Sequence, residues 1–245
     1  MSSEQTISRS RQMLTLVAAC LAVLILPASL TGTSVAIPQI NAELRPGLVA
    51  LQWVVNAYNL TFAAFMLISG SLADILGRKR VFISGTALFA ACSLVSVIAH
   101  NILLLDVARG LSGIGAAAMM TAGSALLAQA YAGKRLAKAF AIFGSAAGAG
   151  LAVGPSLSGL LVGFAGWRSV FGSHLAVAVV ILLLTIGVPE GEIAPATSRI
   201  DWAGAGTFTP ALFAFVLAIM EGPQLGWVAP FVMVGGAASA IFGVL

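Results

Sequence analysis

The chain has 245 residues, of which 60% are apolar and 8% are charged, and its mean hydropathy is +1.05. A soluble domain carries about a quarter charged residues, so this composition excludes a water-soluble globular protein and predicts a membrane protein. The net charge of +4 would suit a nucleic-acid-binding protein only if the basic residues gathered on one exposed face. They are spread along the chain, so we expect no nucleic acid among its partners.

Several apolar stretches are each long enough to cross a bilayer as a helix, which takes about 20 residues. They lack the alternation of polar and apolar residues that a membrane barrel strand needs, so helices are predicted. The expected fold class is an all-α polytopic membrane protein. We place its transmembrane spans at residues 13–37, 51–73, 81–99, 102–127, 137–163, 168–188, 203–221 and 227–245.

The segments between the spans set the expected orientation, because basic residues concentrate in cytoplasmic loops. With residues 1–12 in the cytoplasm, nine basic residues lie inside and two, Arg45 and Arg168, lie outside. We therefore expect a multi-pass protein of the cell membrane with a cytoplasmic N-terminus and a cytoplasmic linker at 189–202. The inside residues are Arg9, Arg11, Arg78, Lys79, Arg80, Lys134, Arg135, Lys138 and Arg199.

Sequence features that bind nucleotides or metals are missing. The chain has no GxxxxGK[ST] phosphate loop, and its two cysteines, Cys20 and Cys92, lie inside apolar runs where neither a disulfide framework nor a CxxC metal site is available. We therefore expect no cofactor and no metal ion. Any uphill work must draw on an ion gradient or on a separate subunit.

Arg109 is the most informative residue, because it falls about seven residues into a span, where a charge costs roughly 2.5 to 3.5 kcal/mol. Asp106 lies one turn earlier on the same helix face. Buried ionisable groups usually mark a pathway, so we expect Arg109, with Asp106 beside it, to have a functional role. The alternative interpretation is a locally paired arginine that is merely tolerated.

The junction between the second and third spans combines two glycines, an acid and three bases. The glycines permit close helix approach and a tight turn, while the acid caps or pairs where the bases crowd together. A simple cytoplasmic hairpin would need the turn and the positive charges, but not an acid at the membrane edge. The residues of this junction are Gly70, Asp74, Gly77, Arg78, Lys79 and Arg80.

The span at 137–163 has regularly spaced glycines and a proline near its middle. Such spacing lets helix backbones pack closely, and the proline removes one helical hydrogen bond. Tight packing alone would explain the glycines, but a Gly-Pro pair at mid-membrane favours a bending helix. The residues concerned are Gly150, Gly154, Pro155 and Gly159.

Together these motifs resemble those of the major facilitator superfamily, specifically its drug/proton antiporter family with fourteen spans. The loop motif G-x-L-A-D-R-x-G-R-K is matched except at Ile75, where a basic residue is usual. The motif R-x-x-Q-G-x-G-A-A of the fourth span is matched from Arg109 onward, with Ser112 in place of Gln. The motif G-x-x-x-G-P-x-x-G-G of the fifth span is matched from Gly150 onward, with Ser158 in place of one Gly. Further similar segments contain Trp53, Tyr58, Trp167, Arg168, Phe171, Asp201, Trp202, Gly204, Gly226 and Trp227.

One departure from the family pattern bears on mechanism. The first-span motif L-D-x-T-I-V-N-V-A-L-P aligns with residues 28–38, which puts Ser29 at the place of a membrane acid. A serine hydroxyl does not titrate at physiological pH, so Ser29 cannot carry a proton. Asp106 or Arg109 would have to share that task.

The resemblance implies a transporter whose two bundles rock around a small-molecule substrate, with proton-coupled efflux of amphipathic or drug-like molecules. By this resemblance the junction residues from Gly70 to Arg80 would form a conformational latch that closes the cytoplasmic side, and Arg109 with Asp106 would couple protonation to substrate. The 150–159 helix would seal the pathway, and Trp53 and Tyr58 are candidates to face the substrate. Residues 13–188 would form the six-helix N-terminal bundle, and 203–245 two additional transmembrane helices. The chain ends before a second bundle, which a second copy or a separate C-terminal half would have to supply.

Two alternatives stay open. One is a truncated or half-transporter that does not transport alone and acts as a membrane binding partner. The other is an intramembrane serine protease, since Gly110, Ser112 and Gly113 with His174 resemble the serine and histidine pairing of rhomboid proteases. Against the protease, the glycine expected three residues after the histidine is Val177.

Overall fold

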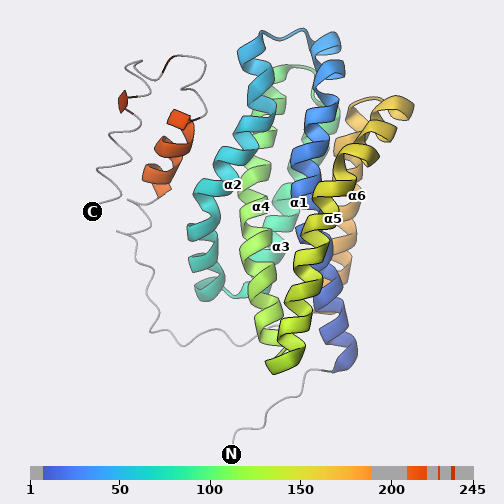
Figure 1. Ribbon diagram of the computed structural model, residues 1–245, viewed down its shortest axis with the longest axis vertical. Coiled ribbons are helices and arrows are strands. Elements are labelled where there is room, and N and C mark those ends of the chain that lie inside the picture. The colour runs from blue at the N-terminus through green and yellow to red at the C-terminus, as the bar shows by residue number, and fades with distance from the viewer. Residues whose placement is uncertain (1–7, 189–208, 220–225, 227–232, 235–245) are drawn as a thin grey trace, which may run out of the picture.

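A computed structural model of the protein describes residues 8–188, 209–219, 226 and 233–234. Its long helices form one upright bundle in which successive helices run in opposite directions (Figure 1). Each of them is long and apolar enough to cross a membrane. The helices are α1 (Arg9–Leu44), α2 (Leu48–Leu76), α3 (Arg78–Ile98), α4 (Ile102–Ala130), α5 (Gly133–Ala165) and α6 (Arg168–Thr185).

The first six predicted spans each fall on one of these helices, and the described residues contain no strand, so the all-α prediction is confirmed for this part of the chain. Five of these helices are longer than the predicted spans, whereas α6, with 18 residues, ends before the predicted limit at residue 188. The 36 residues of α1 make a helix about 54 Å long, against about 30 Å of hydrocarbon, so its ends project into the headgroup regions.

The two further transmembrane helices predicted at 203–221 and 227–245 are not established. A short apolar helix, Thr209–Ile219, falls within the first of these spans. Most of the second span and the whole linker at 189–202 lie outside the described residues.

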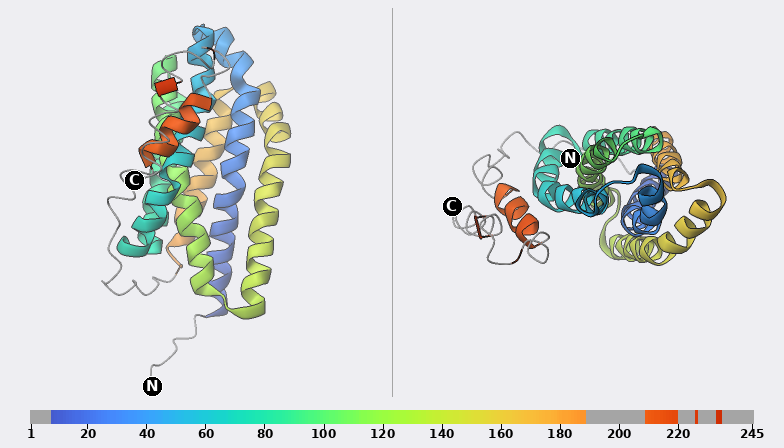
Figure 2. Two further views of the ribbon diagram at one scale, coloured as in Figure 1. Left: turned by 60° about the vertical axis from the view of Figure 1, so that its left-hand side comes forward. Right: turned by 90° about the horizontal axis from the view of Figure 1, so that it is seen from above.

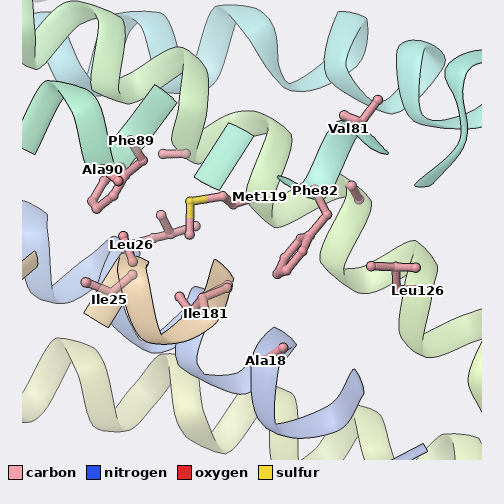
Figure 3. Close-up of a cluster of buried hydrophobic side chains, with 14 of the residues drawn as sticks. Ala18, Ile25, Leu26, Val81, Phe82, Phe89, Ala90, Met119, Leu126 and Ile181 are labelled. Atoms are coloured by element: carbon pink, nitrogen blue, oxygen red, sulfur yellow. The ribbon is translucent and has the colours of Figure 1, made fainter. Parts of the chain in front are cut away.

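α1 occupies the middle of the bundle, where it contacts α4, α5 and α6, while α4 also packs against α2 and α3 (Figure 2). Figure 3 shows the main apolar cluster, in which Leu26 of α1, Phe82 of α3, Met119 of α4 and Ile181 of α6 meet. Lipid is as apolar as these side chains, so close van der Waals packing rather than escape from water holds the helices together.

Small residues set a close contact between α3 and α4. A Cβ atom placed on Gly85 of α3 would lie 2.9 Å from the carbonyl oxygen of Gly115 on α4. Only glycine allows backbones to approach so closely. This contact fixes α3 against α4 and positions the face of α4 that carries Arg109.

Candidate functional site

The side chain of Arg109 is buried inside the bundle, with 2% of its surface exposed. Its Nε donates a hydrogen bond to the carbonyl oxygen of Val54 on α2 at 3.0 Å, and its Nη1 donates to the hydroxyl of Ser29 on α1 at 3.0 Å. The guanidinium lies over the ring of Tyr58, 4.4 Å from the ring centre. Arg109 therefore joins α4 to α1 and α2 through contacts that lie deep within the spans.

The positive charge of Arg109 has no carboxylate partner in the part of the chain that the structure describes. Within the same residues its Nη2 has no hydrogen-bond partner, and neither has the buried Oδ1 of Asp106. The interpretation of a locally paired arginine is therefore wrong. Neutral dipoles and an aromatic ring stabilise the guanidinium instead, which makes Arg109 a buried cation without a counter-ion among these residues.

Asp106 lines a shallow groove between the first turns of α2 and α4, and apart from this carboxylate the side chains of the groove are apolar. Trp53 forms part of its wall. Tyr58 lies elsewhere: it is 2% exposed, and its hydroxyl donates to the carbonyl oxygen of Leu26 at 3.3 Å. The structure thus divides the predicted residues between the groove, with Trp53 and Asp106, and the bundle interior, with Tyr58 and Arg109.

The predicted latch lies at the end of the bundle where Gly77 separates α2 from α3. Gly77 has a φ of 98°, which glycine adopts without strain. Arg78 donates to Oδ1 of Asp74 at 3.3 Å and to a backbone carbonyl of α4 at 3.1 Å, so it links three helices. Lys79, half-buried, and Arg80, exposed, follow in the first turn of α3.

Gly150 and Gly154 of α5 face α1 at close range. A Cβ atom on either would press against the backbone of α1, at 2.9 Å for Gly154. The nearest atom to a Cβ on Gly159 would be 4.0 Å away, and α5 continues through Pro155 as a helix. At Gly70 a Cβ would meet no described atom within 4 Å, so none of the described helices approaches closely there.

A polar cluster at the opposite end of the bundle escaped the sequence analysis. Glu43 of α1 accepts hydrogen bonds from the indole of Trp167 at 2.7 Å and from Arg168 at 2.6 Å. Arg168 also donates to the carbonyl oxygen of Ala99, which precedes α4, at 3.0 Å. Trp167 and Arg168 were part of a segment that resembles the family in sequence. Their acid partner, Glu43, lies 124 positions before Trp167 and was not predicted.

Ser112 and His174 do not form the catalytic pair of a serine protease. The Ser112 hydroxyl donates to the carbonyl oxygen of Arg109 at 2.7 Å, and the His174 ring contacts the rings of Phe89 and Phe171. No hydrogen bond joins Ser112 to His174 within the described ranges. Those ranges also contain no group of three or more side chains that could hold a metal ion.

Residues 19–245 match the family model described as Major Facilitator Superfamily. The chain is 37% identical over 217 residues to multidrug resistance protein Stp of Mycobacterium tuberculosis, covering 88% of this chain and 40% of the relative. It is 33% identical over 239 residues to drug efflux pump JefA of the same species, covering 95% of this chain and 47% of the relative. It is 32% identical over 216 residues to methylenomycin A resistance protein of Bacillus subtilis, covering 88% of this chain and 46% of the relative. The chain thus spans less than half the length of these relatives.

Two solved transporters share the fold. The chain matches the POT family transporter PepTSo with a TM-score of 0.67 and 15% identity, covering 93% of this chain and 51% of that one. It also matches the peptide transporter POT, solved in complex with alafosfalin. Here the TM-score is 0.64 and the identity 16%, and the match covers 88% of this chain and 52% of that one. In each case the chain corresponds to about half of the solved protein.

Proposed function

Because the chain belongs to the major facilitator superfamily, we propose that it forms the N-terminal bundle of a multidrug efflux transporter. Relatives named for multidrug resistance and drug efflux support this function. The family consists of transporters rather than enzymes, so the protease alternative has no support. The substrates would be small amphipathic or drug-like molecules, expelled at the expense of a proton gradient as in the drug/proton antiporter family with fourteen spans.

The observation that carries the proposal is the buried and uncompensated charge of Arg109. A protein retains such a charge at a cost in stability, which is expected where the charge changes partners during function. Ser29 offers the guanidinium a neutral partner in the present conformation. Asp106, one turn away, offers a carboxylate that could become its partner in a second conformation, with a proton released or bound at the exchange.

The remaining assignments divide the chain by role. Asp74 and Arg78 would hold the cytoplasmic side closed, because their contact links the ends of α2 and α3 to α4. Residues 1–12 would be the cytoplasmic N-terminus, 13–188 the bundle, 189–202 a cytoplasmic linker, and 203–245 two additional transmembrane helices. Trp53, in the groove, is a better candidate to meet a substrate than the enclosed Tyr58.

The second bundle would pack against the face of α5 that points away from α1. This face carries a stripe of small residues, which lets another helix backbone approach closely. Its partner would be the remainder of a longer chain, a separate C-terminal half or a second copy. The exposed residues of the stripe are Ala141, Ser145, Gly148, Ala152, Ser156 and Gly163.

Transport by a full-length protein that contains this segment tests the function. Efflux of a fluorescent drug from cells should collapse when Asp74→Asn or Arg109→Ala is introduced, because each removes a charge that the cycle uses. Lys134→Gln removes an exposed charge from the start of α5 and should leave efflux unchanged at equal expression. Unaltered efflux in both Asp74→Asn and Arg109→Ala would contradict the roles assigned here.

The orientation is tested separately with reporter fusions. A phosphatase that is active only outside the cytoplasm should be inactive when fused after Lys138 and active when fused after His100. Activity after Lys138 would reverse the assignment of the latch to the cytoplasmic side.

A further inference from the structure

Five basic side chains gather at the end of the bundle where α1 and α5 begin, the lower end in Figure 1. Two hydrogen bonds tie these starts together. The side chain of Gln12 donates to the carbonyl oxygen of Ala130 at 3.0 Å, and the hydroxyl of Tyr131, just before α5, donates to the carbonyl oxygen of Gln12 at 2.9 Å. The five residues, which we call the basic patch, are all exposed: Arg9, Arg11, Lys134, Arg135 and Lys138.

The packing of α5 on α1 brings the two sets of charges to one level. The helices run in the same direction, with Gly150 against Leu24 and Gly154 against Ala28, so positions 126 apart in the chain face each other. Carried toward the starts of the helices, this register sets the first turn of α5 level with the first turn of α1. The basic patch is therefore formed by two helices together rather than by one run of charges in the sequence.

Within the part of the chain that the structure describes, no acid pairs with the basic patch. Asp74 lies at the same end of the bundle and is paired with Arg78, while Glu43 and Asp106 lie at the opposite end. The tendency of basic residues to flank spans on one side of a membrane accounts for the end at which they lie. It does not require them to converge from two neighbouring helices, and such a concentration of charge attracts anions.

Exposed apolar side chains lie one to two turns deeper on the same two helices. Met13 and Val17 of α1 are 56% and 40% exposed, and Phe140 and Ile142 of α5 are 38% and 41% exposed. The surface thus passes from positive charge at the end of the bundle to apolar side chains toward its middle. A phospholipid has the complementary order, with its phosphate outermost and its acyl chains toward the middle of the bilayer.

We propose that the basic patch binds an anionic phospholipid with two phosphates, such as cardiolipin. One phosphate faces the bases of α1, the other faces the bases of α5, and acyl chains lie over Met13 and Ile142. Two phosphates suit charges that come from two helices. Phosphatidylglycerol offers only one phosphate, and phosphatidylethanolamine offsets its phosphate with an ammonium group. The site requires only that the chain spans a bilayer, so it does not depend on the proposed transport.

Native mass spectrometry of the purified chain in detergent tests the site. Cardiolipin, phosphatidylglycerol and phosphatidylethanolamine with identical acyl chains are added in turn, and the bound fraction of each is measured. We expect cardiolipin to bind about tenfold more tightly than phosphatidylethanolamine, with phosphatidylglycerol between them. Combining Arg135→Gln with Lys138→Gln should weaken cardiolipin binding about tenfold and leave phosphatidylethanolamine binding unchanged.

The matched control combines Lys79→Gln with Arg80→Gln. It also removes one lysine and one arginine from the same end of the bundle, but from α3, which packs against α4 and α6. The control should keep the preference for cardiolipin. Melting temperatures measured without added lipid in the same detergent distinguish a loss of lipid binding from a loss of folding.

Four results would overturn the proposal. Equal binding of the three lipids by the unmodified chain does so without any variant. An equal loss of cardiolipin binding in the control would mean that the overall charge of this end attracts anionic lipid and that the basic patch is no site. If inorganic pyrophosphate binds as tightly as cardiolipin, the patch is a site for a soluble anion. If the preference appears only after Glu190→Gln and Glu192→Gln, the chain beyond α6 occupies the patch instead of lipid.

Discussion

The hydroxyl of Ser29 accepts a hydrogen bond from Nη1 of Arg109 at 3.0 Å in the interior of the bundle. Ser29 stands where the resembled family carries an acid. The structure therefore brings into contact two residues, Ser29 and Arg109, that the sequence analysis singled out separately. A hydroxyl contributes a dipole but no charge, which leaves the guanidinium without a counter-ion among the described residues. Substitutions at the two positions should therefore have different effects on stability and on transport.

Ser29→Asp should stabilise the chain, because it places a carboxylate beside the buried guanidinium. We expect a gain of about 1 to 3 kcal/mol, in the range of hydrogen bonds to charged groups. The gain should be present at neutral pH and fall on acidification, since protonation of the new carboxyl removes its charge. Thermal unfolding of the purified chain measures this. An equal gain in Ser29→Asn, which fills the same space without charge, would contradict the explanation.

Arg109→Met should abolish transport without lowering the stability of the chain. Replacing an unpaired buried charge with an apolar side chain of similar length removes a desolvation cost, so the melting temperature should stay the same or rise by a few degrees. Efflux by the full-length protein should nevertheless be lost, because methionine cannot exchange polar partners. A large drop in melting temperature would show instead that the neutral contacts of Arg109 hold the helices together.

Gly150→Ala should loosen the contact between α5 and α1, because the new methyl group would overlap the carbonyl oxygen of Leu24. We expect a loss of about 1 to 3 kcal/mol, as for other overpacked sites. Gly148→Ala is the matched control: its methyl group would meet no described atom within 4 Å, and alanine favours the helix by about 1 kcal/mol. Thermal unfolding of both variants in the same detergent should move in opposite directions.

The Glu43–Arg168 contact should contribute little stability on its own, because both side chains are partly exposed, at 49% and 31%. A double-mutant cycle with Glu43→Gln and Arg168→Gln should give a coupling energy of about 0.5 to 1 kcal/mol. The coupling should decrease at high salt, which screens exposed charges. A coupling that is large and independent of salt would mean that the pair is shielded from water.

The positions of the first six helices were predictable, because an apolar stretch of about 20 residues in a bilayer can satisfy its backbone only as a helix. The importance of Arg109 and the anomaly at Ser29 were predictable for a related reason. Polar groups within spans are few and costly, so each one is visible in the sequence.

The partners of these residues were decided by the tertiary structure alone. Arg109 and Asp106 are three residues apart, yet the first reaches Ser29, 80 positions earlier, while the second turns to the groove beside α2. Arg168 likewise meets Glu43 across 125 positions. The helical period places a side chain on one face of its own helix, but which helix lies opposite that face depends on how the bundle packs.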